Sequence, residues 1–204
     1  MAEALNHLGV THYISGDVLR AQEDFDRALA IWQRVRYDEG LADTLLNLGY
    51  LHADLGNTQA SLDFYARALE VNLSIRDERR RALTLTAMGG VYALQGEKQK
   101  ALNLHQQALN IFRAIGNRGG EAATLNGIGY LYDDLGKKGR ALKCYAAALQ
   151  LDQSIDNRAY AAITSGYIGR VHFALGEKEK ALGYYEQSWL RAAPYRTGGW
   201  SHIR

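Results

Sequence analysis

Proline and cysteine are almost missing from this sequence of 204 residues, which holds one of each, Pro194 and Cys144. Since no proline precedes residue 194, helices can run without the breaks that proline causes. A single cysteine excludes an intrachain disulfide and favours a reducing compartment. We therefore expect a cytoplasmic protein, in which Cys144 lies half-buried and unreactive inside a helix.

Long apolar runs and a strong charge of one sign are also missing. No run of 18 apolar residues is present, and the N-terminal MAEALNHLG has neither the basic nor the apolar region of a signal peptide. The net charge of +2 is too small to indicate nucleic acid or a membrane as a partner. These absences predict no membrane span, no secretion and no nucleic-acid binding.

Motifs that would indicate catalysis or a cofactor are missing too. There is no HExxH, no CxxC and no pair of histidines at metal-ligand spacing. The stretch Gly127-Ile128-Gly129 lacks the third glycine of a dinucleotide-binding motif, and Gly136-Lys137-Lys138 lacks the Ser or Thr of a phosphate loop. We expect no enzyme activity, no cofactor and no bound metal.

The sequence does contain a repeat of 40 residues without insertions. One glycine set is Gly9, Gly49, Gly89, Gly129 and Gly169, and a second is Gly16, Gly56, Gly96, Gly136 and Gly176. The same register holds an aromatic position, occupied by Phe25, Tyr65, His105, Tyr145 and Tyr185. A further position holds His12, His52, Tyr92, Tyr132 and His172, so these histidines are predicted to pack like aromatic residues rather than to bind metal.

Each repeat is predicted to be a helix, a tight turn, a second helix and a short loop. Leu5, Leu8 and His12 have helical spacing, and Gly16 suits the left-handed residue that ends a helix. Gly9 lies inside the first helix, where glycine costs about 1 kcal/mol relative to alanine. We expect this glycine set to let the second helix approach closely.

These positions resemble the tetratricopeptide repeat. The fourth repeat carries its signature as Leu125, Ile128-Gly129, Tyr132, Ala141, Tyr145 and Ala148. The period resembles the 40-residue subclass found in the adaptor LGN, in bacterial Rap-type regulators and in bacterial arrays fused to CHAT-type peptidases. The connector IGNRGGEA at residues 115–122 is similar to that of the CHAT-associated arrays.

The resemblance implies an all-α fold, a right-handed superhelical solenoid of five antiparallel helix hairpins. It predicts one array over residues 1–204, with repeats at about 1–40, 41–80, 81–120, 121–160 and 161–200. Residues 198–204 align with residues 118–124, the start of a first helix, so the chain is expected to be a piece of a longer protein. The alternative is an irregular cap over residues 189–204. Because no polar capping repeat is recognisable, weak self-association through the ends is also expected.

Partners of this family usually lie in the groove lined by the first helices. The residues predicted to bind there are Glu3, Asn6, Asp43, Tyr50, Asp54, Asn126, Tyr130, Asp133, Asp134 and Arg170. Five of these are acidic and one is basic, so we predict a protein or peptide partner that is basic or carries aromatic residues. The alternative is a solvated acidic surface without a dedicated ligand.

The expected function is therefore a protein–protein interaction scaffold. The resemblance also allows the regulatory segment of a larger signalling enzyme, such as a CHAT-type peptidase or an ATPase. Arg79, Arg80 and Arg81 directly follow Asp77 and Glu78 and are predicted to form local ion pairs rather than a phosphate site.

Overall fold

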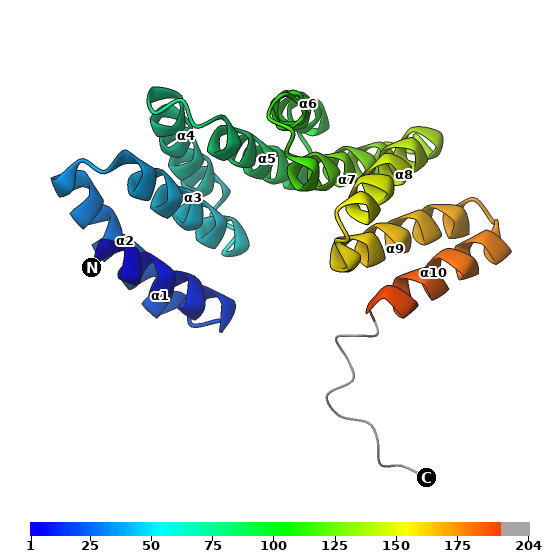
Figure 1. Ribbon diagram of the computed structural model, residues 1–204, viewed down its shortest axis with the longest axis horizontal. Helices are drawn as coiled ribbons and strands as arrows, with labels where there is room; N and C mark the ends of the chain where they lie inside the picture. Colours follow the sequence, from blue (N-terminus) through cyan, green and yellow to red (C-terminus); the bar gives the residue numbers. More distant parts are fainter. Residues whose placement is uncertain (193–204) are drawn as a thin grey trace, which may run out of the picture. The chain divides into compact units, whose positions relative to one another are not determined.

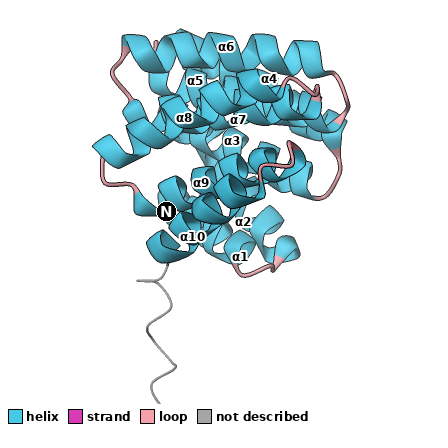
Figure 2. Cartoon of the chain, turned by 90° about the vertical axis from the view of Figure 1, so that its right-hand side faces the viewer, coloured by secondary structure: helices cyan, strands magenta, loops and turns pink. Residues whose placement is uncertain are grey.

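The computed structural model describes residues 1–192, and these form ten helices joined by short loops (Figures 1 and 2). The first helices of the hairpins are α1 (Ala2–Ile14), α3 (Asp38–Asp54), α5 (Glu78–Leu94), α7 (Arg118–Asp134) and α9 (Arg158–Ala174). The second helices are α2 (Val18–Val35), α4 (Thr58–Ser74), α6 (Lys98–Ala114), α8 (Lys138–Ser154) and α10 (Lys178–Ala192). The predicted all-α solenoid of five antiparallel hairpins is confirmed.

The chain divides into two compact units, the first from Met1 to Ile111 and the second from Phe112 onward, so that the boundary lies within α6. The expectation that one array extends from residue 1 to 204 remains a prediction. Residues 198–204, which align in sequence with the start of a first helix, lie outside the described residues.

The tight turn of each hairpin contains the second glycine set in the left-handed conformation. The φ angle of Gly16 is +83°, and its equivalents range from +71° to +79°. In the first hairpin the Gly16 amide donates to the Tyr13 carbonyl at 3.1 Å, and the Asp17 amide donates to the His12 carbonyl at 2.9 Å. This bonding satisfies the last carbonyl groups of α1, as the sequence predicted.

The loops between hairpins also require a left-handed residue, which the sequence analysis missed. Arg36, Arg76 and Asp156 have φ angles of 53°, 57° and 51°, and Gly116 occupies the same repeat position with 68°. A side chain in this conformation costs about 1–2 kcal/mol. Because only one repeat has glycine here, the residue types gave no signal for the turn.

Aromatic rings lie directly on the first glycine set. A Cβ atom added to Gly129 would lie 2.6 Å from Cε1 of Tyr145, and one added to Gly9 would lie 2.6 Å from Cε1 of Phe25. The same contact pairs Gly49 with Tyr65, Gly89 with His105 and Gly169 with Tyr185. The predicted reason for these glycines, close approach of the second helix, is confirmed.

Within each unit, the same aromatic position also joins neighbouring hairpins. Phe25 packs with Leu48 and Leu51, and Tyr145 packs in the same way with Ile168 and Val171. Leu8 shares the repeat position of Leu48 but is 48% exposed.

Candidate functional site

A cavity of about 580 Å³ opens in the first unit, on the side of α1, α3 and α5 where three predicted binding residues lie. Its lining includes Glu3, Asn6, Trp32, Tyr37, Glu39, Asp43 and Arg80. The structure thus brings together Glu3, Asn6 and Asp43 from the predicted set. Trp32, Tyr37, Glu39 and Arg80 were not predicted for this site.

The aromatic wall of the cavity depends on a glycine at the start of α3. A Cβ atom added to Gly40 would lie 2.5 Å from Cε2 of Trp32, so only glycine lets the indole lie flat against the helix. Tyr37 is the residue that precedes α3, and its ring centroid lies 5.1 Å from that of Trp32. The two rings form an apolar surface beside the acidic residues.

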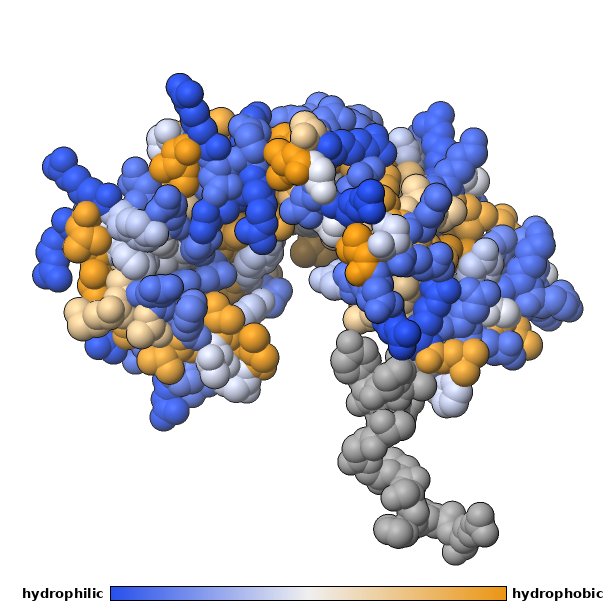
Figure 3. All heavy atoms as spheres, viewed as in Figure 1, coloured by the Kyte–Doolittle hydropathy of each residue, from blue (hydrophilic) through white to orange (hydrophobic). Residues whose placement is uncertain are grey.

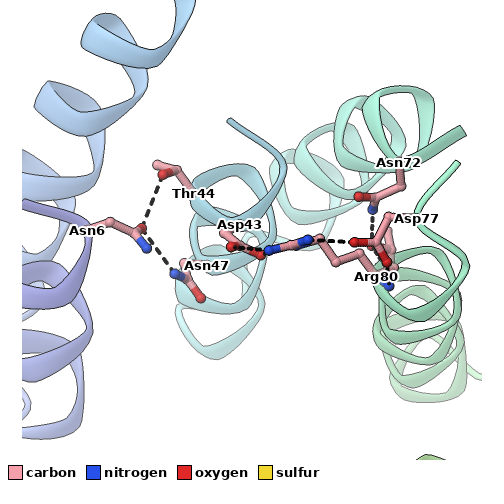
Figure 4. A network of polar contacts seen from close by, with 8 residues as sticks. Asn6, Asp43, Thr44, Asn47, Asn72, Asp77 and Arg80 are labelled. Carbon is pink, nitrogen blue, oxygen red and sulfur yellow. Dashed lines mark hydrogen bonds and ion pairs between the residues drawn. The ribbon is translucent and has the colours of Figure 1, made fainter. Parts of the chain in front are cut away.

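Arg80 connects two carboxylates at the base of this site (Figure 4). Its Nε and one terminal nitrogen donate to the two carboxylate oxygens of Asp43 at 2.7 and 2.9 Å. Its other terminal nitrogen lies 2.5 Å from Oδ2 of Asp77. The hydrogen bonds to Asp43 and Asp77 raise the pKa of Arg80. The predicted local pair with Asp77 is confirmed, and the contact with Asp43 is an additional one across hairpins.

Glu3 and Glu39 have no cation beside them among the described residues. Among the described residues, neither carboxylate forms an ion pair, and Glu3 is exposed. Glu39 raises the pKa of Tyr37 through a hydrogen bond and through its charge, and the charge of Glu3 adds to this effect. Both residues line the same cavity.

Asn6 has a structural task in addition to lining the cavity. Its Oδ1 accepts hydrogen bonds from Thr44 Oγ1 and from Asn47 Nδ2, each at 3.1 Å (Figure 4). Both donors belong to α3, and Thr44 is fully buried. The Asn6 side chain therefore holds the first two hairpins together, and its amide nitrogen remains for a ligand.

Tyr50 and Asp54 lie further along α3. Tyr50 is 37% exposed, and its ring meets that of Tyr65 edge-on with 5.6 Å between centroids. Asp54 accepts a hydrogen bond from the hydroxyl of Tyr13. Burial, together with this bond, raises the pKa of Tyr13 to about 12. Part of the Tyr50 ring is thus exposed, and Asp54 links α3 to α1.

In the second unit, three predicted residues form a cluster on α7 and α9. The Arg170 guanidinium lies 5.7 Å from the ring centroid of Tyr130, and one of its nitrogens lies 3.1 Å from Oδ2 of Asp133. Lys138 Nζ lies 2.5 Å from the other carboxylate oxygen of Asp133. Asp133 thus has two cations beside it, and Tyr130 is 49% exposed. Asp134 is exposed next to this cluster.

Asn126 was expected on the open face, but it is buried, with 8% exposure. Its Nδ2 donates to Thr164 Oγ1 at 2.7 Å, and Thr164 Oγ1 lies 3.5 Å from a carboxylate oxygen of Asp152. Burial raises the pKa of Asp152 to about 6. This network joins α7, α8 and α9, so Asn126 stabilises the contact between these helices.

The ion pairs reduce the negative charge that the sequence led us to expect. Arg80 and Lys138 were not assigned to the open face, yet they lie against Asp43 and Asp133. The sequence spacing could have predicted two of these ion pairs, because Asp43 and Arg80 are separated by 37 residues, as are Asp133 and Arg170. A repeated separation between opposite charges indicates neighbouring hairpins.

Two of the histidines and the cysteine have packing roles. His52 stacks on Phe64 and His172 on Tyr184, with ring centroids 5.2 and 5.5 Å apart, which confirms aromatic packing at this position. Cys144 is half-buried, and burial raises the pKa of its thiol, as expected for an unreactive cysteine.

Metal sites and membrane spans have no candidate in the described part of the chain. Within residues 1–192, no group of three or more His, Cys, Asp or Glu side chains is placed to hold a metal ion. Over the same residues, no helix has the length and apolar character needed to cross a bilayer.

Comparison with known proteins identifies the repeat. A tetratricopeptide-repeat family model matches residues 1–74 and 78–154, and a second one matches residues 126–197. No curated protein is similar enough in sequence to count as a relative.

Solved structures are similar in fold at low sequence identity. BtubC (BKLC) from P. vanneervenii has a TM-score of 0.80 and 20% identity, over 99% of this chain and 84% of its own. A Rap protein in complex with competence and sporulation factor has a TM-score of 0.85 and 18% identity, over 95% of this chain. The chain spans 54% of that Rap protein. A putative kinesin light chain from Podosopora anserina has a TM-score of 0.71 and 15% identity, over 96% of this chain and 97% of its own.

Proposed function

Because the chain belongs to the tetratricopeptide-repeat family, we propose that it is a protein-interaction scaffold that binds a peptide segment of a partner protein and catalyses no reaction. The Rap structure, which contains competence and sporulation factor, is an example of a protein of this fold in a complex. The partner of this chain is a separate question, which the chemistry of the site must answer.

The observation that carries the proposal is the cavity of about 580 Å³ in the first unit. Its lining combines the rings of Trp32 and Tyr37 with two carboxylates, Glu3 and Glu39, that have no cation beside them in the described chain. A guanidinium or ammonium group gains from carboxylates through charge-assisted hydrogen bonds and from aromatic faces through cation–π contact. The cavity therefore suits an arginine or lysine side chain of the partner.

Other predicted residues would contact the peptide outside the cavity. Asn6 can offer its amide nitrogen to a peptide carbonyl, and Tyr50 offers a partly exposed ring. In the second unit, the pair formed by Tyr130 and Arg170 offers a separate contact to a partner. We assign the basic side chain to the first unit because Asp133 in the second unit already has two cations beside it.

Selection from a random peptide library displayed on phage tests this proposal. We expect the wild-type chain to enrich peptides that contain arginine or lysine, with an aromatic residue nearby. The double variant Glu3→Gln/Glu39→Gln should lose this preference and bind the selected peptides about tenfold more weakly, since a charge-assisted hydrogen bond contributes about 1.5–3 kcal/mol.

Glu70→Gln is a matched control, because Glu70 is an exposed carboxylate on α4 and does not line the cavity. It should bind the selected peptides like the wild type. Enrichment of acidic peptides, or equal binding by the double variant, would contradict the assignment of a basic side chain. If no peptide is enriched and no protein partner is captured by crosslinking from Glu3, the scaffold function itself is wrong.

A further inference from the structure

The chain holds a guanidinium group of its own beside the cavity of the first unit. Arg80 donates two parallel hydrogen bonds to Asp43, from Nε at 2.7 Å and from a terminal nitrogen at 2.9 Å (Figure 4). Its other terminal nitrogen contacts Asp77, the residue that precedes α5. This arrangement joins the second hairpin to the third and shows which groups hold an arginine side chain in this fold.

The equivalent place between the first two hairpins lacks the arginine. One repeat earlier, Glu3 stands at the position of Asp43, and Gly40 stands at the position of Arg80. Both line the cavity of about 580 Å³, and Glu3 has no ion pair within the described residues. The later repeats carry uncharged residues at the position of this acid, namely Leu83, Ala123 and Ile163. Among the five repeats, only the first combines the acidic residue with glycine at the partner position.

A second exchange accompanies the glycine. A Cβ atom added to Gly40 would lie 2.5 Å from Cε2 of Trp32, so no larger residue fits there while the indole is present. In the next repeat the position of Trp32 holds the smaller Asn72, which leaves room for the side chain of Arg80 (Figure 4). The chain thus uses either asparagine with arginine or tryptophan with glycine. The second combination removes the internal guanidinium group and adds an aromatic ring to the lining of the cavity.

We propose that an arginine side chain of the partner peptide binds in this place and repeats the contacts of Arg80. The proposal rests on the proposed function, in which the cavity accepts a basic side chain, and it assigns that side chain to arginine rather than lysine. Glu3 accepts two parallel hydrogen bonds from the guanidinium group, as Asp43 does from Arg80. Trp32 offers an aromatic ring, on which a planar guanidinium group stacks.

The cavity also supplies a second carboxylate. Arg80 contacts Asp77 in addition to Asp43, but the position of Asp77 is occupied by Tyr37 in the first repeat. Glu39, two residues further along, forms a hydrogen bond with Tyr37 and lines the same cavity. In Figure 3 hydrophilic and hydrophobic side chains lie next to one another over α1 and α3, which matches this lining of carboxylates and rings.

A lysine side chain fits these groups less well. Its ammonium group is a single point of charge, which does not match the two oxygens of one carboxylate in parallel and lacks the planar shape that stacks on a ring. The bidentate contact adds one charge-assisted hydrogen bond, which corresponds to about a tenfold difference in affinity. Peptides with arginine should therefore bind about tenfold more tightly than the same peptides with lysine.

Two pools of labelled heptapeptides test the proposal, random in sequence except for a central arginine in one pool and a central lysine in the other. Fluorescence polarisation measures their binding to the wild-type chain, which should be about tenfold tighter for the arginine pool. Equal binding of both pools would overturn the choice of arginine and leave the basic side chain of the proposed function standing. Binding of neither pool would contradict both.

A variant that supplies its own guanidinium group tests the place of binding. Trp32→Asn/Gly40→Arg installs in the first repeat the pair that the second repeat has at Asn72 and Arg80. The introduced side chain should pair with Glu3 and fill the cavity, so the preference for the arginine pool should be lost. Trp32→Asn alone is the control, which should still prefer the arginine pool because Glu3 stays free. Far-UV circular dichroism checks that both variants fold.

Thermal melts separate filling of the cavity from damage to it. In the double variant, the further substitution Glu3→Gln should lower the melting temperature by about 2–4 °C, because an ion pair is lost. In the wild-type chain Glu3→Gln should leave the melting temperature unchanged, since Glu3 has no ion pair there among the described residues. A double variant that still prefers the arginine pool, or whose melting temperature does not depend on Glu3, would overturn the proposed place.

Discussion

The contact between Gly129 and Tyr145 allows a quantitative test of the packing within a hairpin. In Gly129→Ala the new methyl group would lie 2.6 Å from Cε1 and 2.8 Å from Cδ1 of the Tyr145 ring. The ring cannot easily withdraw, because Tyr145 is fully buried and its centroid lies 5.4 Å from that of Tyr167. Overpacking of this kind costs about 1–3 kcal/mol.

The substitution also has a favourable part, because alanine in a helix interior is better than glycine by about 1 kcal/mol. We therefore expect Gly129→Ala to lower the free energy of unfolding by up to about 2 kcal/mol. Gly90→Ala is the control, since Gly90 lies inside α5 and a methyl group added there would meet no neighbouring atom within 4 Å. It should raise the free energy of unfolding by about 1 kcal/mol.

The difference between the two variants isolates the overpacking, because the gain in helix propensity cancels. Gly169→Ala should fall between them, since the ring it meets belongs to Tyr185, which is 40% exposed and can move. Urea unfolding followed by far-UV circular dichroism measures the free energy of unfolding of all three variants, provided that its slope against urea concentration is the same for each. If Gly129→Ala stabilises the protein as much as Gly90→Ala does, the close-approach explanation of this glycine set is refuted.

Three further predictions follow from the loops, the core and the ion pairs. Arg76→Gly should raise the free energy of unfolding in thermal melts by about 1 kcal/mol, because Arg76 has a left-handed φ of 57° that glycine adopts without strain. Gly116→Arg should lower the free energy of unfolding by a similar amount. If neither variant changes it, the left-handed loop conformation carries no cost. Burial lowers the pKa of His105 to about 4, below that of an unfolded histidine. The contribution of neutral His105 to the free energy of unfolding is therefore fully present above about pH 6.5 and is lost as the pH falls toward 4. His105→Phe should make the free energy of unfolding less dependent on pH in this range. An unchanged slope against pH would show that His105 is not the cause. A double-mutant cycle with Asp43→Asn and Arg80→Gln should give a coupling energy of about 1 kcal/mol, and a value near zero would show that their contact is not formed in solution.

The 40-residue period was enough to predict the helices, the turns and the contacts inside each hairpin. These features depend on residues close in the chain, where helical spacing fixes which side chains share a face. Gly16 in its left-handed turn and Gly129 under the ring of Tyr145 are examples. The left-handed loops at Arg36 and Arg76 were missed, because their residue types carry no signal for that conformation.

What lies between hairpins was decided by the tertiary structure. The sequence placed Asp43 and Asp133 on one acidic face. The fold brings Arg80 to Asp43 and Lys138 to Asp133. The sequence could not predict these pairs, because a long basic side chain can reach several acidic residues and the packing of the helices decides which one it contacts. The same holds for Asn126, whose helix position alone did not reveal that Thr164 of the next hairpin would bury it.

The sequence by itself therefore determined the repeat, its helices and the family, since these follow from local spacing that recurs along the chain. Only the tertiary structure decided that Trp32 and Tyr37 line a cavity with Glu3 and Glu39, and that Asn126 is buried. The physical reason is that the exposure and the pairing of a side chain depend on which residues of the neighbouring helix lie opposite it, and a periodic pattern alone does not show this.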